Sequence, residues 1–300
     1  MLRVEDLHKK ISNGKTSFLL DEISFHLPKG YICGLIGENG AGKTSLIKTL
    51  SGLYGLDSGR IYIDGMNLQD EEAKIKDELG IVLNECLFDK TMTLEEIGIY
   101  YGEMYSRFDM GRFMEYLTAF KLNKKQKLKT LSKGMEIKLQ LAFALSHDAR
   151  LFLLDEPTAG LDKGFRDDFL KICTDLVSDG ERSVLISTHL TEDMDRIADY
   201  IGYIQDGKLL FFNTKGTVCD RFYIVNGEAY KIKLLPKEAV VYLEENKYSA
   251  TAMVIDKKRF PIQDGLEKHR PNIGEFMYYF VKGGNRNAED IAKRYLEIDS

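Results

Sequence analysis

Short apolar segments separated by turn residues dominate the beginning of the chain. Met1–Asp6 and Ser17–Leu27 have partly alternating apolar and polar positions, so we expect two strands there, with a turn at Asn13-Gly14-Lys15. Longer apolar runs, typical of strands that are covered on both faces, occupy residues 31–36, 81–83, 151–154 and 183–187. Further strands are expected at 60–65, 201–204 and 208–212. This order predicts a parallel core sheet with antiparallel strands at its edge.

Residues 92–147 show helical periodicity, and no strand pattern interrupts them. The sequence Thr93-Leu94-Glu95-Glu96 predicts a capped helix start, and a second helix is expected over Met110–Phe120. For the lysine-rich segment Lys121–Lys129, a solvated linker is favoured over a polyanion site. An all-helical insert in an α/β core, here about residues 88–147, is typical of a subdomain with its own partner surface.

The pattern changes after about Lys215, and no catalytic motif follows. Strands are predicted at 230–235 and 251–255. Helices are predicted at 237–245, 273–282 and 288–297, with a break at Gly283-Gly284-Asn285. We therefore expect an α/β domain over residues 1–215 and a small α+β accessory domain over residues 216–300.

Composition restricts the class of protein. Of the 300 residues, 44% are hydrophobic and 30% are charged, as in an ordinary soluble globular protein. The net charge of −5 provides no general attraction to nucleic acid or anionic lipid, so no nucleic-acid partner is expected. The first residues contain no apolar signal segment, and no run approaches the ~18 apolar residues of a membrane helix, so work on a membrane would require a partner. The scattered cysteines predict reduced thiols in a cytoplasmic protein: Cys33, Cys86, Cys173 and Cys219.

One motif indicates phosphate chemistry. Gly37-Glu38-Asn39-Gly40-Ala41-Gly42-Lys43-Thr44 fits G-x-x-x-x-G-K-[ST], with an apolar strand before it and a helix opening at Ser45 after it. Its backbone N–H groups and the helix N-terminus form an anion site. Lys43 is expected at the β- and γ-phosphates, and the Thr44 hydroxyl at Mg²⁺. We therefore predict a nucleotide phosphate site over residues 37–45.

Two carboxylates follow the apolar run 151–154, at the strand end where the nucleotide crevice is expected. Asp155 is expected to hold Mg²⁺ through water, and Glu156 to orient and polarise the attacking water. His189 follows the next core strand, and we interpret it as a γ-phosphate contact; the competing interpretation is a structural histidine.

A second motif points to a protein family. Leu131-Ser132-Lys133-Gly134-Met135, before a helix expected over Glu136–His147, resembles the signature loop of ATP-binding cassette (ABC) proteins. Ala159-Gly160-Leu161-Asp162 resembles the D-loop of that family, and His189 resembles its switch histidine. Together with the phosphate loop, these motifs occur in the family's order between Leu2 and about Phe212.

The resemblance implies a phosphate-loop (RecA-like) α/β core with an antiparallel β edge and an all-helical insert. It also implies ATP and Mg²⁺ as cofactors, and two cassettes packed head to tail, as a homodimer or with a paralogue. Each nucleotide is then held by the phosphate loop of one subunit and by the signature loop (Ser132, Gly134) of the other, with Asp162 of the D-loop beside them.

The implied function is an ATP-hydrolysing subunit that powers transport through a separate membrane permease, at the inner face of the cell membrane. The Lys-Gly-Met signature resembles exporters of peptides and antibiotics, so we expect export of a peptide, antibiotic or lipid-like compound. In this family the helical insert receives a short helix from the permease. We expect Leu87 and Phe88 to line the groove for it, together with some of the insert's larger side chains: Ile97, Tyr100, Tyr101, Met104, Phe113 and Tyr116.

Two positions depart from the family pattern. Asn84 stands where the family usually carries glutamine, and either Asn84 or Glu85 is expected to take that residue's role near Mg²⁺. Ile11 stands where an aromatic side chain usually stacks on the base, and Phe18 is the nearest aromatic residue. The alternative functions are a soluble ABC ATPase with a non-transport role and a module regulated through its C-terminal domain.

Overall fold

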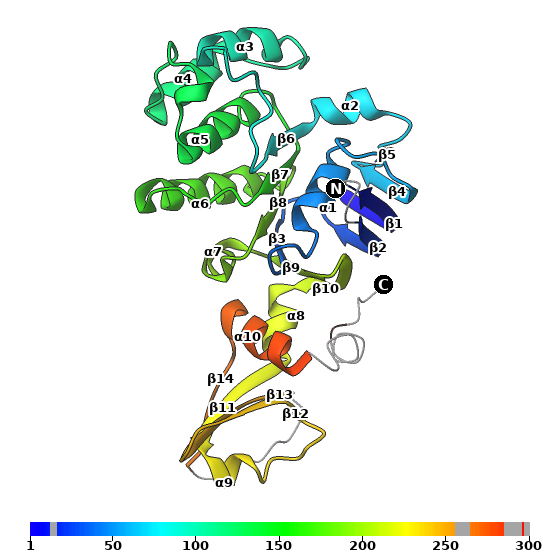
Figure 1. Ribbon diagram of the computed structural model, residues 1–300, viewed down its shortest axis with the longest axis vertical. Helices are drawn as coiled ribbons and strands as arrows, with labels where there is room; N and C mark the ends of the chain where they lie inside the picture. The colour runs from blue at the N-terminus through cyan, green and yellow to red at the C-terminus, as the bar shows by residue number, and fades with distance from the viewer. Residues whose placement is uncertain (13–16, 256–264, 285–295, 297–300) are drawn as a thin grey trace. The chain divides into compact units, whose positions relative to one another are not determined.

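The computed structural model describes residues 1–12, 17–255, 265–284 and 296, and the chain divides into two compact units (Figure 1). The first unit comprises Met1–His189 and Ile204–Leu209, and the second comprises Leu190–Tyr203 and Leu210–Ser300. The turn predicted at 13–15 lies outside the described residues. So does the helix predicted at 288–297, apart from Leu296.

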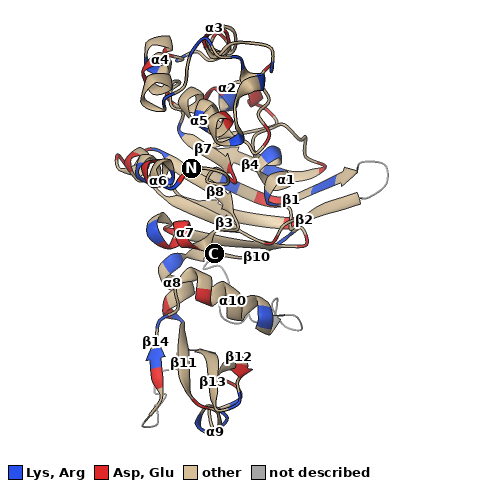
Figure 2. Cartoon of the chain, turned by 60° about the vertical axis from the view of Figure 1, so that its left-hand side comes forward, with Lys and Arg blue, Asp and Glu red and all other residues tan. Residues whose placement is uncertain are grey.

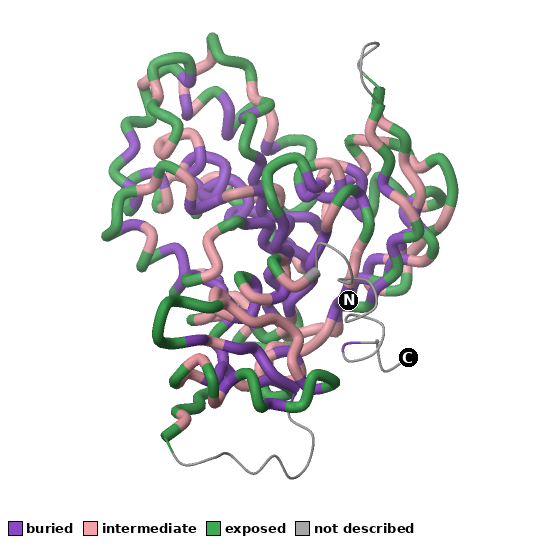
Figure 3. Tube along the Cα trace, turned by 60° about the horizontal axis from the view of Figure 1, so that its bottom comes forward, coloured by how far each residue is buried: buried purple, intermediate pink, exposed green. Residues whose placement is uncertain are grey.

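A parallel sheet forms the core of the first unit. Its central strands lie in the order β3 (Ile32–Ile36), β8 (Ser183–Thr188), β7 (Leu151–Asp155) and β6 (Leu79–Val82). All residues of β3, β7 and β8 are buried, because α1 (Lys43–Leu50) and α6 (Lys163–Val177) pack against the sheet from opposite sides (Figure 1). Figure 3 shows buried residues concentrated toward the middle of the trace and exposed residues along its outer loops. The full strand order is β10-β9-β3-β8-β7-β6, with β9 at Tyr200–Gln205 and β10 at Lys208–Thr214. The predicted core strands are confirmed.

An antiparallel sheet in the order β2-β1-β4-β5 confirms the predicted antiparallel edge. Its strands are β1 (Leu2–Ser12), β2 (Ser17–Leu27), β4 (Ser58–Ile63) and β5 (Met66–Asn67). The register of β1 against β2 shifts between Val4 and Leu7, and Asp6 within this bulge has a φ of 46°. A Cβ on Gly59 would approach the carbonyl oxygen of Asp6 to 2.3 Å, so the bulge requires glycine on the neighbouring strand.

The short helix α2 (Glu72–Asp77) precedes β6, and the helical insert follows it. The insert consists of α3 (Leu94–Gly102), α4 (Met110–Ala119), the 3₁₀ helix η1 (Leu128–Thr130) and α5 (Lys133–Ala144). Thr93 caps α3 as predicted: its hydroxyl accepts the Glu96 N–H at 3.2 Å, and the Glu96 carboxylate accepts the Thr93 N–H at 2.7 Å. The helix α5 begins earlier than predicted, because the Ser132 side chain accepts the Met135 N–H and caps it.

Charged side chains of both signs are interspersed over the described elements (Figure 2). Glu78 contacts Arg107 of the insert at 2.8 Å and Arg150, just before β7, at 3.1 Å, so one carboxylate links the insert to the core sheet. Within the segment Lys121–Lys129 the lysines are exposed, and Lys124 pairs with Glu95 at 2.8 Å.

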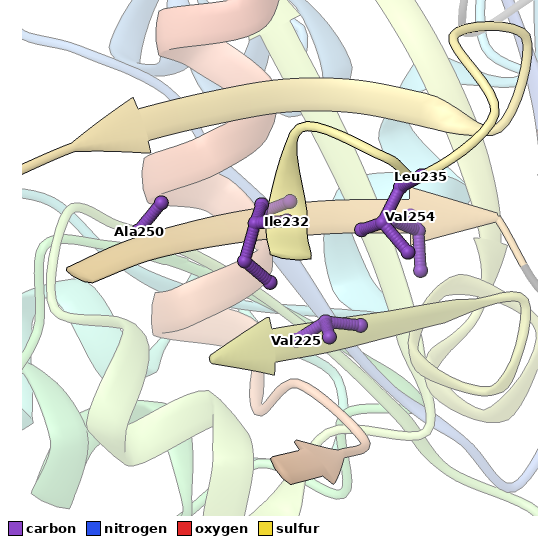
Figure 4. Close-up of a cluster of buried hydrophobic side chains, with 6 residues drawn as sticks. Val225, Ile232, Leu235, Ala250 and Val254 are labelled. Carbon is purple, nitrogen blue, oxygen red and sulfur yellow. The ribbon is translucent and has the colours of Figure 1, made fainter. Parts of the chain in front are cut away.

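The second unit contains an antiparallel sheet in the order β12-β13-β11-β14. Its strands are β11 (Phe222–Glu228), β12 (Val240–Glu245), β13 (Ser249–Ile255) and β14 (Glu267–His269). The short helix α9 (Ala229–Ile232) packs on one face through a buried apolar cluster (Figure 4): Val225, Ile232, Leu235, Ala250, Ala252 and Val254. Side chains of β11 alternate between the two faces of the sheet, so Phe222 and Ile224 point away from the face that carries Val225 and α9. On that other face, the Phe222 ring lies 5.2 Å from the ring of Phe276 in α10 (Ile273–Gly284). The sheet therefore has a helix on each face.

Two further helices belong to the second unit, α7 (Thr191–Ile197) and α8 (Lys215–Asp220). The Asp195 carboxylate of α7 accepts the N–H of Ile273 at 2.7 Å, at the start of α10. Lys215 donates its ammonium to the carbonyl oxygen of Asp195 at 2.8 Å. The helix that directly follows His189 in the chain is thus joined to the last described helix.

Two predictions for this region are wrong. Residues 230–235 were expected as a strand but include the helix α9, because Ile232 and the following Leu235 both join the apolar cluster on one face of the sheet. Residues 237–245 were expected as a helix but contain β12, because pairing with β13 outweighs the local helical pattern. The helix expected at 273–282 is confirmed and continues through Gly283 and Gly284, whereas Asn285, the last residue of the expected break, lies outside the described residues.

Candidate nucleotide site

The phosphate loop joins β3 to α1. Gly40 and Gly42 have φ values of 87° and 111°, which allow the loop to turn sharply into the helix. The Lys43 side chain is buried, and its ammonium donates to the carbonyl oxygens of Gly37 at 2.7 Å and Glu38 at 3.1 Å. The cation is therefore held against the loop whose N–H groups form the predicted phosphate site.

Asp155 is 1% exposed and lies at the carboxyl end of β7. Its carboxylate accepts the Thr44 hydroxyl at 2.9 and 3.0 Å and the Ser187 hydroxyl at 2.6 Å. Mg²⁺ binds oxygen donors, usually one or two carboxylates together with phosphates of the substrate. A hydroxyl beside a carboxylate at the phosphate loop fits that preference.

Glu156 extends the strand end with a left-handed backbone, at a φ of 48°. Its N–H donates to the Ser187 carbonyl at 3.0 Å, which fixes this unusual conformation. One carboxylate oxygen lies 3.4 Å from Nζ of Lys43, and the other lies 2.9 Å from Nδ1 of His189. The carboxylate is thus positioned between the phosphate-loop cation and the histidine.

These groups border a cavity of about 330 Å³, large enough for a phosphate chain and part of a nucleotide. Its lining includes the phosphate loop, Glu156 and His189: Phe18, Glu38, Asn39, Gly40, Gly42, Lys43, Thr44, Ser45, Asn84, Glu156, Ala159 and His189. A second cavity of about 370 Å³ shares Thr44 and Asn84 with the first and is lined by Asp155 as well. Asn84 borders both cavities, whereas Glu85 borders only the second.

The signature loop and the D-loop contact one another. A Cβ on Gly134 would approach the carbonyl oxygen of Gly160 to 2.8 Å. Asp162 caps α6 by accepting the Phe165 N–H at 3.0 Å, and this hydrogen bond lowers the pKa of its carboxyl group. Ser132, Gly134 and Asp162 do not border the cavity that contains Lys43, whereas Lys133 of the signature loop borders the second cavity together with Thr44.

Ile11 occupies the position of the usual base-stacking aromatic residue, but Phe18 lies closer to the nucleotide cavity. Ile11 and Phe18 are register partners across β1 and β2, but only Phe18 borders the nucleotide cavity. The Phe18 ring lies 2.8 Å from the position of a Cβ on Gly42, so it packs directly on the phosphate loop. Phe18 is therefore the aromatic side chain placed to contact a base.

One functional residue escaped the sequence analysis. Ser187 is buried, is the register partner of Asp155, and binds both that carboxylate and the Glu156 N–H. The available signal was a hydroxyl at the end of the apolar run 184–186, two positions before the histidine.

All four cysteines are free, and burial raises the pKa of the Cys86 thiol to about 11, so that thiol is poorly reactive.

Comparison with known proteins agrees with this geometry. The family model described as "ABC transporter" matches residues 20–159. The linearmycin resistance ATP-binding protein LnrL of Bacillus subtilis is 34% identical over 227 residues, covering 74% of this chain and 71% of that protein. This chain belongs to the ABC transporter family.

The lantibiotic transport ATP-binding protein SrtF of Streptococcus pyogenes is 31% identical and covers 70% of this chain and 89% of that protein. A solved dimeric ATP-binding cassette in a post-hydrolysis state, bound to ADP and Pi, has the same fold, with a TM-score of 0.64 at 21% identity over 71% of this chain and 98% of the other. The chain is accordingly the ATP-binding subunit of an ABC transporter, and its reaction is ATP hydrolysis coupled to transport. Among the described helices, none is long and apolar enough to cross a bilayer.

The position of Phe18 predicts a loss of base affinity in Phe18→Ala. Stacking is worth ~1–3 kcal/mol per base in nucleic-acid binders, so we expect about tenfold weaker ATP binding in a fluorescence titration. Ile11→Ala, on the opposite strand, is the matched control and should bind normally. Tripolyphosphate has no base and should bind both variants equally; a loss with that probe too would assign Phe18 to packing on the loop.

The geometry of Glu156 predicts that Glu156→Gln retains nucleotide binding and loses turnover by ~10²-fold or more, because the amide cannot accept a proton from water. Phosphate release from ATP measures the effect. Glu115→Gln, an exposed carboxylate on α4 that borders neither cavity, should hydrolyse ATP at a normal rate. Turnover near that of the wild type in Glu156→Gln would exclude Glu156 as the base.

Proposed function

We propose that this ATPase drives export of a peptide, antibiotic or lipid-like compound through a separate membrane subunit, at the inner face of the cell membrane. The observation that carries the direction and substrate class is the similarity to a linearmycin resistance protein and a lantibiotic transport protein. We assign ATP hydrolysis to residues 1–215 and an accessory role to residues 216–300.

The site residues have distinct roles in hydrolysis. Glu156 accepts a proton from the attacking water, and His189, 2.9 Å away, orients that carboxylate and contacts the γ-phosphate. Lys43 moves its ammonium from the loop carbonyls to the β- and γ-phosphates. Thr44, Asp155 and Asn84 hold Mg²⁺, which neutralises phosphate charge when it is bound. The N–H groups of residues 37–45 bind the remaining phosphate oxygens.

Two cassettes complete each site in this proposal, as a homodimer or with a paralogue. Ser132 and Gly134 lie at the exposed N-terminus of α5 and do not border their own chain's nucleotide cavity. A second subunit placed head to tail would receive them at its γ-phosphate, next to Asp162 of the D-loop. The dimeric cassette of the same fold supports this arrangement.

A dimer of this kind predicts different defects for two variants. Ser132→Arg should bind ATP as a monomer but fail to dimerise, because a bulky cation would enter the facing nucleotide site. Lys43→Ala should weaken monomer binding itself, since it removes a phosphate contact. Size-exclusion chromatography with ATP in the Glu156→Gln background, together with nucleotide titration, separates them. A loss of monomer binding in Ser132→Arg would contradict the assignment of the signature loop.

An apolar cavity of about 250 Å³, which we assign to the permease helix, lies between the insert and the part of the core formed by β6 and the ends of α1 and α2. Its lining includes four of the larger apolar and aromatic groups around the insert: Leu87, Phe88, Tyr101 and Phe143. The rings of Phe88 and Phe143 lie 5.0 Å apart, and Leu87 is 55% exposed. Ile97 and Phe113 are buried inside the insert, as expected for most of these residues, whereas Tyr100, Met104 and Tyr116 lie outside the cavity lining.

This cavity predicts that Phe88→Asp releases the membrane subunit while ATP binding persists. A charge transferred to an apolar groove costs several kcal/mol, and Phe88 does not border the nucleotide cavity. Co-purification with the membrane subunit tests the prediction. Ile99→Asp is the matched control, because Ile99 is 54% exposed on α3 and does not border the apolar cavity. Equal retention of the subunit by both variants would place the docking surface elsewhere.

A further inference from the structure

Gln140 is a buried amide in the apolar middle of α5, with 5% of its surface exposed. Its Nε2 donates to the Leu83 carbonyl at 3.0 Å, and its Oε1 accepts the Leu83 N–H at 3.0 Å. One side chain therefore satisfies both backbone groups of Leu83, in the way that a neighbouring strand would.

Leu83 lies at the point where the chain leaves the core sheet. The pairing of β6 with β7 ends at Val82 and Leu154, and Leu83 is itself buried. The helix α5, rather than the sheet, thus fixes the backbone at residue 83. The next residue is Asn84, which borders the nucleotide cavity and the cavity that contains Thr44 and Asp155.

We propose that Gln140 is a positioning residue that holds Asn84 at the metal side of the nucleotide site. The inference rests on the proposed role of Asn84 at Mg²⁺. The Leu83 N–H belongs to the peptide group shared with Val82, and the Leu83 carbonyl belongs to the one shared with Asn84, so the Gln140 amide restrains the peptide groups on both sides of Leu83. Since α5 begins at the signature serine, Ser132, the same helix then connects the signature loop to the metal side of the site.

Two other buried polar side chains in or just after α5, His147 and Ser146, do not contact the backbone next to Asn84. His147, beyond the C-terminus of α5, contacts the Leu79 carbonyl at 2.9 Å and so binds the opposite end of β6, away from Asn84. Ser146 is also buried, but its hydroxyl donates to Ala142 within its own helical segment. Gln140 alone among these three contacts the residue adjacent to Asn84. It also borders the apolar cavity assigned to the permease helix.

The test compares the full-length wild type with Gln140→Leu, Gln140→Glu, Asn84→Ala, Gln140→Leu/Asn84→Ala and Ser146→Ala. A fluorescent ATP analogue is titrated with Mg²⁺ and with EDTA, and the ratio of the two dissociation constants measures the affinity that the metal adds. Gln140→Leu removes both hydrogen bonds at similar volume. Gln140→Glu keeps an acceptor for the Leu83 N–H but sets a carboxylate oxygen against the Leu83 carbonyl in place of the donor. It is a second, polar replacement and gives an independent measurement if the leucine variant does not fold.

We expect the metal-dependent gain in affinity to fall by about tenfold in Asn84→Ala and in both Gln140 variants, as is usual when a group supporting a metal ligand is removed. Affinity in EDTA should not change. The double variant should show no greater loss than Asn84→Ala, because both changes act on one ligand. Ser146→Ala should retain the full gain.

Two results would overturn the inference: a normal gain in both Gln140 variants, or an additive loss in the double variant. Either would assign Gln140 to stability alone. If Asn84→Ala itself retains the gain, the proposed role of Asn84 at Mg²⁺ fails, and the role of Gln140 fails with it. The two failures are therefore distinguishable by the single variants.

Discussion

The nucleotide site depends on the satisfaction of one buried carboxylate. Asp155 is almost inaccessible to solvent, and an unpaired charge in such a position would be strongly destabilising. Thr44 from the start of α1 and Ser187 from β8 both donate to it, so three separate segments must meet at the end of β7. This meeting fixes the phosphate loop beside Glu156. The same contacts that stabilise the core therefore set the distance between the phosphate-binding and proton-accepting groups.

The parallel pairing of β7 with β8 brings these side chains together at the same edge of the sheet, so no long loop is needed. Asp155 and Ser187 are register partners, so their side chains share one face of the sheet at its carboxyl edge. Glu156 and His189 then leave that edge one or two residues later and approach to 2.9 Å. The left-handed backbone of Glu156 is the local cost of bringing its carboxylate back toward Lys43.

The sequence allowed prediction of the parts in which local pattern and tertiary contacts agree. The core strands, the phosphate loop, the Thr93 cap and the meeting of Lys43, Glu156 and His189 belong to this class. Long-range contacts decided the rest. The segment around Ile232 alternates like a strand, yet it is helical because its apolar side chains must cover a sheet whose strands come from elsewhere in the chain. Likewise, the packing of Phe18 against the phosphate loop, and not the pairing of β1 with β2, places Phe18 rather than its register partner Ile11 at the edge of the nucleotide cavity.

The bond between Asp195 and Ile273 affects how the protein can be divided by genetic engineering. Residues 190–203 precede the predicted domain border at 215, but they pack with residues 210–300 as one unit. A protein truncated after residue 215 would retain α7 but lose α10, whose Ile273 N–H donates to Asp195 of α7. The cut would remove the partner of the Asp195 carboxylate, six residues after His189. A deletion at residue 215 would therefore leave α7 attached to the catalytic residues without the helix that it contacts.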